Sequence, residues 1–337
     1  MLKRLRQAVL GLLLAIFCLS ADETQAQELV FSQIHRQPLL LNPALTGHIE
    51  GNYRFILLYR QQGLNVGSNP VYQTPSVSAD FNVGGGPHTW GIGLSVTNDI
   101  SAGGALNDLM ALASLAFHLS IDQKSRHYIS LGFQGGLRQL RLKPNELSFG
   151  EQFSGIGFDP NLSNGESFDR TQSTNAELRT GVTWSTYTEG LKIILGGAYF
   201  NFLEPETGFM EGAFRTATIA GHAQFRIRAG KRFWFEPEAV YFQQSGVDHY
   251  NAGALLAFKG KEGRSGFSFG LFYRSEDALV PRVEIQVKDW LIGFSFDRTI
   301  SELNTVNNGA GAIEASLRFQ GKVLKTPDAV LPAIRFH

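Results

Sequence analysis

Cysteine is almost absent from this sequence, which limits the chemistry that we expect. Of 337 residues one is cysteine, Cys18. It lies within residues 1–26, where basic residues precede an apolar run and small residues follow, as in a secretory signal peptide. Lipid attachment at Cys18 is the alternative, but Ile16 and Phe17 are bulky where such a site needs small residues. We expect residues 1–26 to be cleaved, leaving no disulfide bond and no reactive thiolate.

An excess of charge of either sign is also lacking. The chain has 30 Lys and Arg residues against 30 Asp and Glu residues, so composition gives no indication of a nucleic-acid partner or an acidic tail. Long apolar runs and a sustained 3.6-residue apolar stripe are missing, and the mean hydropathy is −0.08. These features argue against a helical membrane protein. They do not argue against a membrane barrel, because half of each barrel strand is polar.

Motifs of catalysis and nucleotide binding are missing as well. The sequence has no nucleophile elbow, HExxH, P-loop or glycine-rich nucleotide fingerprint. His118 and His222 lie in stretches with strand periodicity, where one sequence cannot pair them with a nucleophile. The acidic residues of 143–173 lack the spacing of a calcium loop, so we interpret that segment as a solvated outer loop. We therefore expect no enzymatic activity, no metal and no cofactor.

Glycine and phenylalanine are abundant, with 37 and 26 residues, and apolar side chains alternate with polar ones. The hairpin 214–242 shows the pattern best. Phe225 and Ile227 share one face of its first arm, and Arg226 and Arg228 share the other. A period of two is the strand period. Both arms exceed ten residues, the length with which a tilted strand crosses a bilayer.

The same pattern recurs along the chain and predicts an all-β protein, a transmembrane antiparallel outer-membrane β-barrel of about 14 strands. We expect residues 1–26 as the signal peptide, 27–52 as an N-terminal periplasmic or plug segment, 53–320 as the barrel and 321–337 as a C-terminal periplasmic tail. The predicted strands are 53–60, 71–82, 89–99, 105–121, 127–142, 174–187, 191–203, 214–228, 232–245, 249–259, 265–275, 281–287, 290–299 and 310–320. Alternation is weakest in 105–121.

Connections after even-numbered strands are short, and those after odd-numbered strands are mostly longer, with 143–173 the longest. Short periplasmic turns and long outer loops are typical of outer-membrane barrels. An even strand count returns both termini to the periplasm. Aromatic residues near strand ends, among them Trp90, Trp234 and Trp290, fit an interfacial girdle. A soluble β-sandwich is the competing fold, but it would have shorter strands and no such loop asymmetry.

The two ends of the chain resemble a known family. The lead-in FSQIHRQPLLLNPALTG and the block beginning Gly293-Phe294-Ser295-Phe296-Asp297 are similar to the start and the end of the PorP/SprF family of type IX secretion system membrane proteins. The chain ends in Arg335-Phe336-His337 without the cysteine that often precedes the family's final Arg-Phe. The positions that carry the resemblance are Phe31, Ser32, Gln33, Pro38, Asn42, Pro43, Gly47, Gly293, Asp297, Ser301, Leu303, Glu314, Arg335 and Phe336.

The resemblance implies a barrel in the outer membrane of a Gram-negative bacterium that works with the type IX secretion and gliding apparatus. Its implied partners are outer-membrane lipid, secretion components and the C-terminal domains of secreted adhesins, and the carrying positions become partner-binding candidates. A transport barrel for a small solute is the alternative. The polar strand faces add candidate lumen residues, for which pairing across strands and lining of a path are both open: Arg138, His222, Arg226, Glu236, Glu238, Arg274, Glu284 and Arg318.

Overall fold

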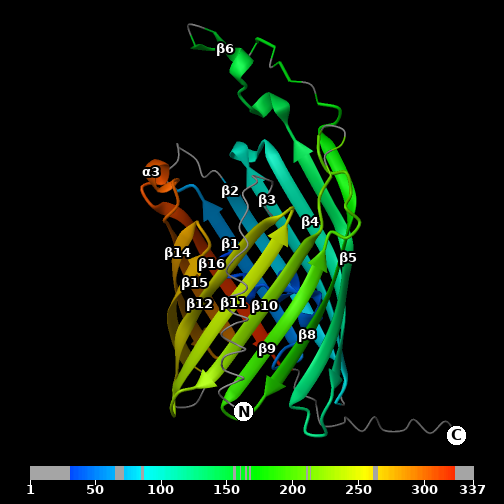
Figure 1. Ribbon diagram of the computed structural model, residues 1–337, viewed down its shortest axis with the longest axis vertical. Helices are drawn as coiled ribbons and strands as arrows, with labels where there is room; N and C mark the ends of the chain where they lie inside the picture. The colour runs from blue at the N-terminus through cyan, green and yellow to red at the C-terminus, as the bar shows by residue number, and fades with distance from the viewer. Residues whose placement is uncertain are drawn as a thin grey trace, which may run out of the picture.

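Fourteen long strands form a closed barrel in the computed structural model (Figure 1). The structure describes residues 31–322 apart from 65–71, 85–86, 155–156, 160, 164, 167, 210–211, 213 and 261–264. The barrel strands are β1 (Tyr53–Gln62), β2 (Tyr72–Val83), β3 (Thr89–Ser101), β4 (Leu106–Ser120), β5 (His127–Leu142), β8 (Gln172–Tyr187), β9 (Leu191–Phe200), β10 (Thr218–Arg228), β11 (Phe233–Gln244), β12 (Val247–Lys259), β13 (Ser265–Arg274), β14 (Ala278–Val287), β15 (Trp290–Thr299) and β16 (Ala310–Gly321).

Every neighbouring pair of barrel strands is antiparallel, and β1 pairs with β16 to close the cylinder. The predicted 14-strand barrel is therefore confirmed, and the strand ends agree with the predicted ones to within four residues. The largest error is in the hairpin 214–242. Its first strand begins at Thr218, which pairs with Phe200 at the end of β9, so no neighbouring strand extends far enough to pair with Phe214. That residue instead forms an isolated bridge with Glu206.

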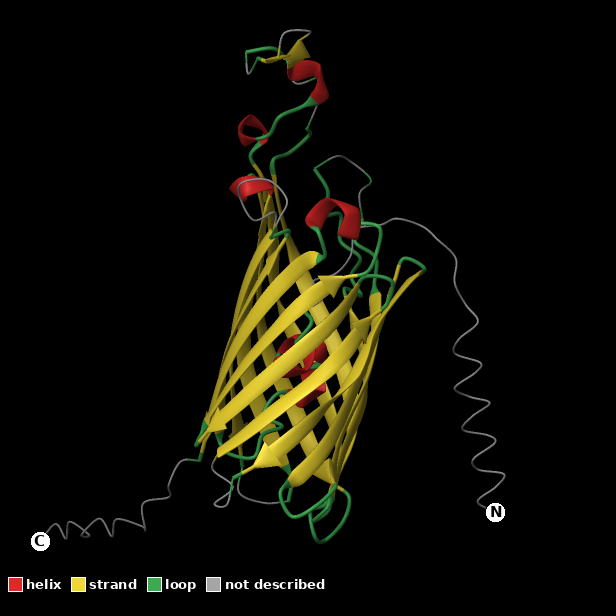
Figure 2. Ribbon diagram, turned by 90° about the vertical axis from the view of Figure 1, so that its left-hand side faces the viewer, coloured by secondary structure: helices red, strands yellow, loops and turns green. Residues whose placement is uncertain are grey.

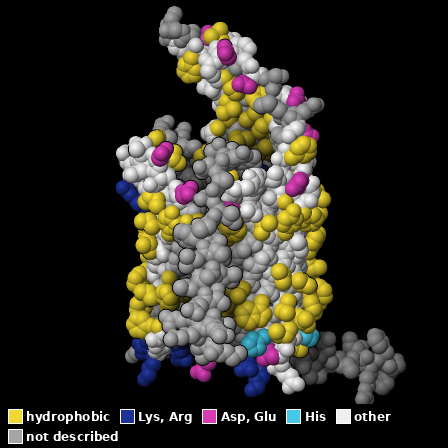
Figure 3. All heavy atoms as spheres, viewed as in Figure 1, with side chains coloured by type: hydrophobic (Ala, Val, Ile, Leu, Met, Phe, Trp, Pro, Cys, Tyr) yellow, Lys and Arg dark blue, Asp and Glu magenta, His cyan; other side chains and the backbone are white. Residues whose placement is uncertain are grey.

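The two faces of the wall differ in polarity, as the alternation predicts. Outward side chains such as Leu94 and Leu131 are exposed, whereas inward ones such as Thr97 and Ser130 are buried. On the face shown in Figure 3, apolar side chains cover much of the wall, and charged side chains lie mainly toward its two ends. This is the surface of a barrel whose exterior meets acyl chains. No helix in the described ranges is long and apolar enough to cross a membrane.

The two ends of the barrel differ in their connections. At one end the turns between strands are tight, and β1 begins and β16 ends there; we call it the short-turn end. The opposite, long-loop end carries η3 (Ala102–Gly104), α3 (Asn304–Asn307) and a projecting loop with η4 (Pro144–Glu146), η5 (Gly150–Gln152), β6 (Phe153–Ser154) and β7 (Gly157–Phe158) (Figure 1). The small β6–β7 ladder was not predicted, because two-residue strands leave no periodic signal.

Residues 31–47, which we call the lumenal segment, lie inside the barrel (Figure 2). They form three short turns of helix, η1 (Ile34–Arg36), α2 (Pro38–Leu41) and η2 (Pro43–Leu45). Pro38 and Pro43 each occupy a first helical position, where a missing N–H costs nothing. The short helices therefore hold a compact path, and the wall satisfies many of their remaining polar groups.

We expect Leu94→Arg, near the middle of β3, to destabilise the barrel by about 2–4 kcal/mol, because it places a cation against acyl chains near the bilayer midplane. The matched control is Leu303→Arg. The two leucines are 63% and 61% exposed, but Leu303 lies in the β15–β16 loop. Urea unfolding in phospholipid vesicles measures both. Equal losses for the two variants would contradict a lipid-facing β3.

Candidate functional site

The lumenal segment begins against the last two strands of the barrel. The backbone amides of Ser32 and Gln33 donate to the two carboxylate oxygens of Glu314 on β16, at 2.6 and 2.8 Å. The Gln33 side-chain amide donates to Ser295 Oγ on β15 at 3.1 Å, and Ser316 Oγ donates to Gln33 Oε1 at 2.8 Å. Charge-assisted bonds to a carboxylate are among the strong hydrogen bonds. They fix the start of the segment to the wall.

A buried ion network surrounds this contact. Arg60 of β1 lies between the carboxylates of Glu314 and Asp297, 2.8 Å from Asp297. Arg274 of β13 pairs with Asp297 at 2.8 Å and donates to Ser32 Oγ at 2.6 Å. Removing one member of such a network would leave an uncompensated buried charge. The network therefore ties Ser32 to four separate strands, β1, β13, β15 and β16.

A second ion cluster holds Arg36 in the middle of the segment. Its guanidinium lies 2.7 Å from Glu284 and 3.4 Å from Glu238. Arg282 contacts the same two carboxylates, at 2.6 Å from Glu284 and 3.1 Å from Glu238. Two arginines thus balance two glutamates inside the barrel. One of the four charges belongs to the lumenal segment, and the wall supplies the other three.

The end of the segment is held by neutral polar groups. The Asn42 side chain donates to the carbonyl of Gly197 at 3.0 Å, lies 3.1 Å from His222 Nε2 and accepts from the Ala44 amide. His118 Nε2 lies 2.8 Å from the carbonyl oxygen of Thr46. Asn42 therefore links the turn at Pro43 to strands β8 to β10, because its oxygen caps η2 while its nitrogen reaches the wall.

Glycines in the wall make room for this turn. A Cβ atom on Gly132 would lie 2.2 Å from the Ala44 nitrogen, and one on Gly181 would lie 2.0 Å from the Asn42 side chain. A Cβ on Gly91 would meet the Thr46 carbonyl at 1.9 Å. Real Cβ atoms do not approach other atoms so closely. These three glycines therefore let the backbone of the segment lie directly on the strands.

Apolar contacts complete the packing. Phe31, Ile34 and Leu40 of the segment belong to one buried cluster with residues of the wall, among them Met110 and Phe242. This explains the weak alternation of 105–121. The inward face of β4 is apolar at Met110 because it packs in this cluster rather than facing water.

The structure brings together most of the positions that carry the family resemblance. A Cβ atom on Gly293 would lie 2.6 Å from Gln33 Oε1, and Gly47 donates to Asp80 Oδ2 at 2.7 Å. Ser301 and Leu303 lie apart from them, in the β15–β16 loop. Arg335, Phe336 and the predicted signal peptide fall outside the described residues. The positions buried inside the barrel are Phe31, Ser32, Gln33, Pro38, Asn42, Pro43, Gly47, Gly293, Asp297 and Glu314.

The predicted lumen residues all point inward. Arg138 pairs with Asp108 at 2.6 Å, and Arg226 pairs with Glu236 at 2.9 Å. His222, Glu238, Arg274 and Glu284 take part in the contacts with the segment, and Arg318 lies near the short-turn end. Charged partners that complete the networks were not predicted, among them Arg54 and Asp80, which pair at 2.6 Å. The others are Arg36, Arg60 and Arg282. The sequence signal that could have identified these residues is their position. Arg36 lies in the lead-in, and the others lie on the polar faces of strands.

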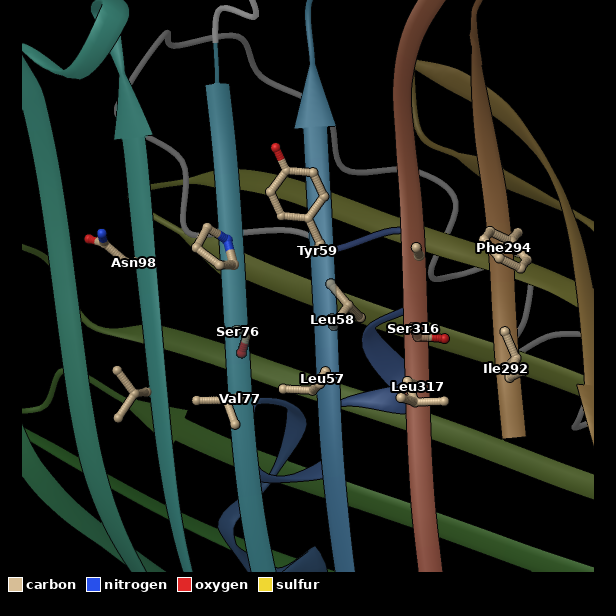
Figure 4. A pocket seen from close by; sticks show the side chains of 13 residues that line it. Leu57, Leu58, Tyr59, Ser76, Val77, Asn98, Ile292, Phe294, Ser316 and Leu317 are labelled. Carbon is tan, nitrogen blue, oxygen red and sulfur yellow. The ribbon is translucent and has the colours of Figure 1, made fainter. Parts of the chain in front are cut away.

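An apolar groove of about 570 Å³ lies on the outer face of the barrel, across β15, β16, β1, β2 and β3 (Figure 4). It exists because Ala315 is small, while its register partners Tyr59 and Phe294 are large. Leu57 and Leu317 line its middle. The groove is part of the lipid-facing wall and is separate from the lumen. In the described ranges, no group of three or more His, Cys, Asp or Glu residues could hold a metal ion.

We expect Gly132→Ala to displace the lumenal segment and to reduce stability by about 1–3 kcal/mol, the usual cost of overpacking. The control is Gly221→Ala, because a Cβ there meets nothing within 4 Å. Urea unfolding gives the stability. Tryptic cleavage after Arg36 measures displacement of the lumenal segment, because Arg36 lies inside the barrel of the unmodified protein. Equal cleavage of the two variants would contradict the close packing at Gly132.

Comparisons with known proteins agree with this architecture. The chain is similar in fold to the Ralstonia pickettii toluene transporter TbuX, with 14% identity, a TM-score of 0.50 and coverage of 86% of this chain and 94% of that chain. It is also similar to the P. putida toluene transporter TodX, with 12% identity, a TM-score of 0.48 and coverage of 84% and 93%. None of the curated proteins matches the sequence significantly.

The fold similarity shows that the chain has the architecture of an outer-membrane β-barrel. The sequence profile described as type IX secretion system membrane protein PorP/SprF matches residues 23–319, which is most of the chain. The match includes both blocks that meet inside the barrel, the lead-in and the last two strands. The chain therefore belongs to the PorP/SprF family of type IX secretion system membrane proteins.

Proposed function

We propose that this protein is a closed, non-enzymatic barrel that serves type IX secretion by binding protein partners at its two ends. In this role it anchors secreted surface proteins or assists their export, and the C-terminal domains of secreted adhesins are the expected cargo. The observation that carries the proposal is the lumenal segment. It fills the interior and is bonded to the wall along its length, from Ser32 to Thr46.

Transport of a small solute is the competing function, and the interior argues against it. A hollow beside the segment, lined by residues including Ile34, Met110 and Phe242, has a volume of only about 20 Å³. A cavity that binds benzene measures about 150 Å³. A solute could pass only after the segment moved, which would break the buried ion pairs of Arg36 and the hydrogen bonds from Ser32 and Gln33 to Glu314. Breaking one buried pair typically costs about 3–5 kcal/mol.

The interior also argues against catalysis. A serine and a histidine do meet, because His118 Nδ1 lies 2.8 Å from Ser130 Oγ. Both side chains are buried, and the other ring nitrogen of His118 is bonded to the Thr46 carbonyl. The pair therefore faces no space in which a substrate could bind. It supports a structural role for His118 and leaves the surface of the barrel for partners.

Exposed apolar side chains at the long-loop end support a role in protein binding. Ile300, Leu303 and Val306 are all exposed around α3, and Phe153 and Phe214 are exposed in the loops of the same end. These loops project beyond the wall (Figure 1). Exposed apolar patches mark sites of protein interaction. In our proposal this end faces the outside of the cell, the short-turn end faces the periplasm, and the signal peptide is cleaved on export.

Conductance in planar lipid bilayers tests whether the barrel is closed. We expect the intact protein to be silent. We expect a variant lacking residues 28–50 to open large, unselective channels, because the lumen then holds only wall side chains. Folding of the variant is checked by the heat-dependent mobility shift of barrels in gels. Steady, solute-specific conductance of the intact protein would favour transport over our proposal.

Co-purification tests the role in secretion. An affinity-tagged copy, extracted from native membranes in mild detergent, should recover type IX secretion components or secreted adhesins. Ile300→Ser/Leu303→Ser/Val306→Ser should reduce recovery of the extracellular partners, because it removes the exposed apolar side chains without touching the lumen. The control is the single change Leu94→Ser, which removes an exposed apolar side chain from the lipid-facing wall. Recovery of neither secretion components nor adhesins with the intact protein would contradict the proposal.

A further inference from the structure

Five cationic side chains converge on the lumen at the short-turn end, just beyond the lumenal segment. We call Lys192, Arg226, Arg228, Lys259 and Arg318 the mouth cluster. They lie at the short-turn ends of β9, β10, β12 and β16, on the inward faces that alternation gives those strands. The five residues are not neighbours in the sequence, because only Arg226 and Arg228 share a strand. Closure of the barrel brings them to one mouth.

Carboxylates neutralise part of this cluster. Lys192 lies 3.2 Å from Glu50, and Arg226 lies 2.9 Å from Glu236. Arg228 lies 3.5 Å from Glu189, whose side chain is almost fully exposed. Exposed pairs of this kind hold their partners only weakly. The acids near the mouth are therefore fewer than the cations, and one of the three pairs is loose.

Two members of the cluster have no carboxylate partner within the described part of the chain. The Nε atom of Arg318 is buried without a hydrogen bond. Lys259 has no ion pair there, and its ammonium group lies 5.4 Å from the centre of the Trp234 ring. A buried guanidinium nitrogen without an acceptor is costly. This cost is an independent indication that an anionic or carbonyl-bearing ligand belongs at the mouth.

Trp234 organises the cluster. The guanidinium carbons of Arg226 and Arg228 lie 5.1 and 5.9 Å from its ring centre, so three cations surround one indole. We predicted that Trp234 belongs to an outward interfacial girdle, and this is wrong. Its position on β11 has the same parity as buried Glu238, so the ring faces the lumen. The indole therefore contacts cations inside the barrel rather than lipid.

The Glu50 carboxyl lies within this positive field. The pKa of the Glu50 carboxyl lies below its ordinary value because Lys192 is close by, and Arg226 and Lys259 contribute in the same direction. Lowering the pKa keeps Glu50 ionised at neutral pH. The surplus of positive charge at the mouth therefore remains after Glu50 has been counted as a full negative charge. A second carboxylate would meet the same field.

The charges on one face of the barrel are divided in the same sense. On the face shown in Figure 3, most of the visible Lys and Arg side chains lie at the short-turn end, and most of the visible Asp and Glu side chains lie toward the opposite end. The exposed cations Lys124, Lys231, Arg232 and Lys288 lie on the turns around the mouth. Such a division attracts an anionic partner to one end of the molecule and steers its approach.

We propose that the mouth cluster is a docking site for an acidic peptide segment of a protein partner in the periplasm. The site takes side-chain or terminal carboxylates, with Arg318 and Lys259 as the groups that bind them directly. Phospholipid headgroups are disfavoured as ligands, because the five side chains point into the lumen and away from the bilayer. The inference deepens the proposed function, on which it rests, by naming the chemistry of the partner at the periplasmic end.

The test uses the purified full-length chain in detergent micelles and a fluorescent ten-residue glutamate peptide, followed by anisotropy. We expect the peptide to bind and its affinity to fall steeply with salt. Lys259→Gln/Arg318→Gln should weaken binding about tenfold or more, if each lost pair contributes about 0.7 kcal/mol. The matched control, Lys143→Gln/Arg298→Gln, removes the same charge at the long-loop end and should bind as the unmodified protein does.

Two results would overturn the inference: no binding of the glutamate peptide, and equal binding of the mouth variant and the unmodified protein. If equal binding is accompanied by loss of co-purified phosphatidylglycerol from the mouth variant, the cluster is reassigned to lipid headgroups. Heat-dependent gel mobility confirms that each variant is folded. The assay needs no secretion component, so its failure would leave the co-purification result, and with it the proposed function, standing.

Discussion

The interior of this barrel depends on one buried carboxylate, that of Glu314. It accepts hydrogen bonds from the backbone of Ser32 and Gln33 and pairs with Arg60, which lies directly opposite it in the β1–β16 ladder. An unpaired carboxylate at this depth would be strongly destabilising. The lumenal segment and the strand that closes the barrel therefore satisfy the same group. Filling the lumen and closing the cylinder are coupled through it.

The same coupling explains why the family pattern lies at the two ends of the chain. Positions near residue 32 and near residue 314 lie at opposite ends of the sequence, but they form one contact. The glycines of the wall belong to it as well, because a Cβ on Gly293 would reach Gln33. A family can keep such a pattern for structural reasons alone. The partner-binding surfaces are then to be sought in the loops and at the mouth.

The sequence alone was sufficient to predict the strands of the barrel. It was not sufficient to predict the path of the segment that fills the lumen. Period-two alternation, turn composition and loop lengths are local signals, and they gave 14 strands with the correct orientation of nearly every face. The path of the lumenal segment is not local, because its short helices are stabilised by wall groups hundreds of residues away. Pairs such as Arg60 with Asp297 require the register and closure of the barrel. Trp234 was misplaced because an indole beside a strand end suits lipid and cations equally well.

The position of the lumenal segment in the chain has a consequence for folding. The segment precedes the whole barrel in the sequence, but many of its charge-assisted contacts are with β14, β15 and β16 near the other end; the Gln33–Ser316 bond spans 283 residues. Contacts of such high order form late and slowly. The segment can settle only after the final hairpin is in place. Its docking would therefore mark a finished barrel, because a barrel without the final hairpin lacks the groups that hold Ser32 and Gln33.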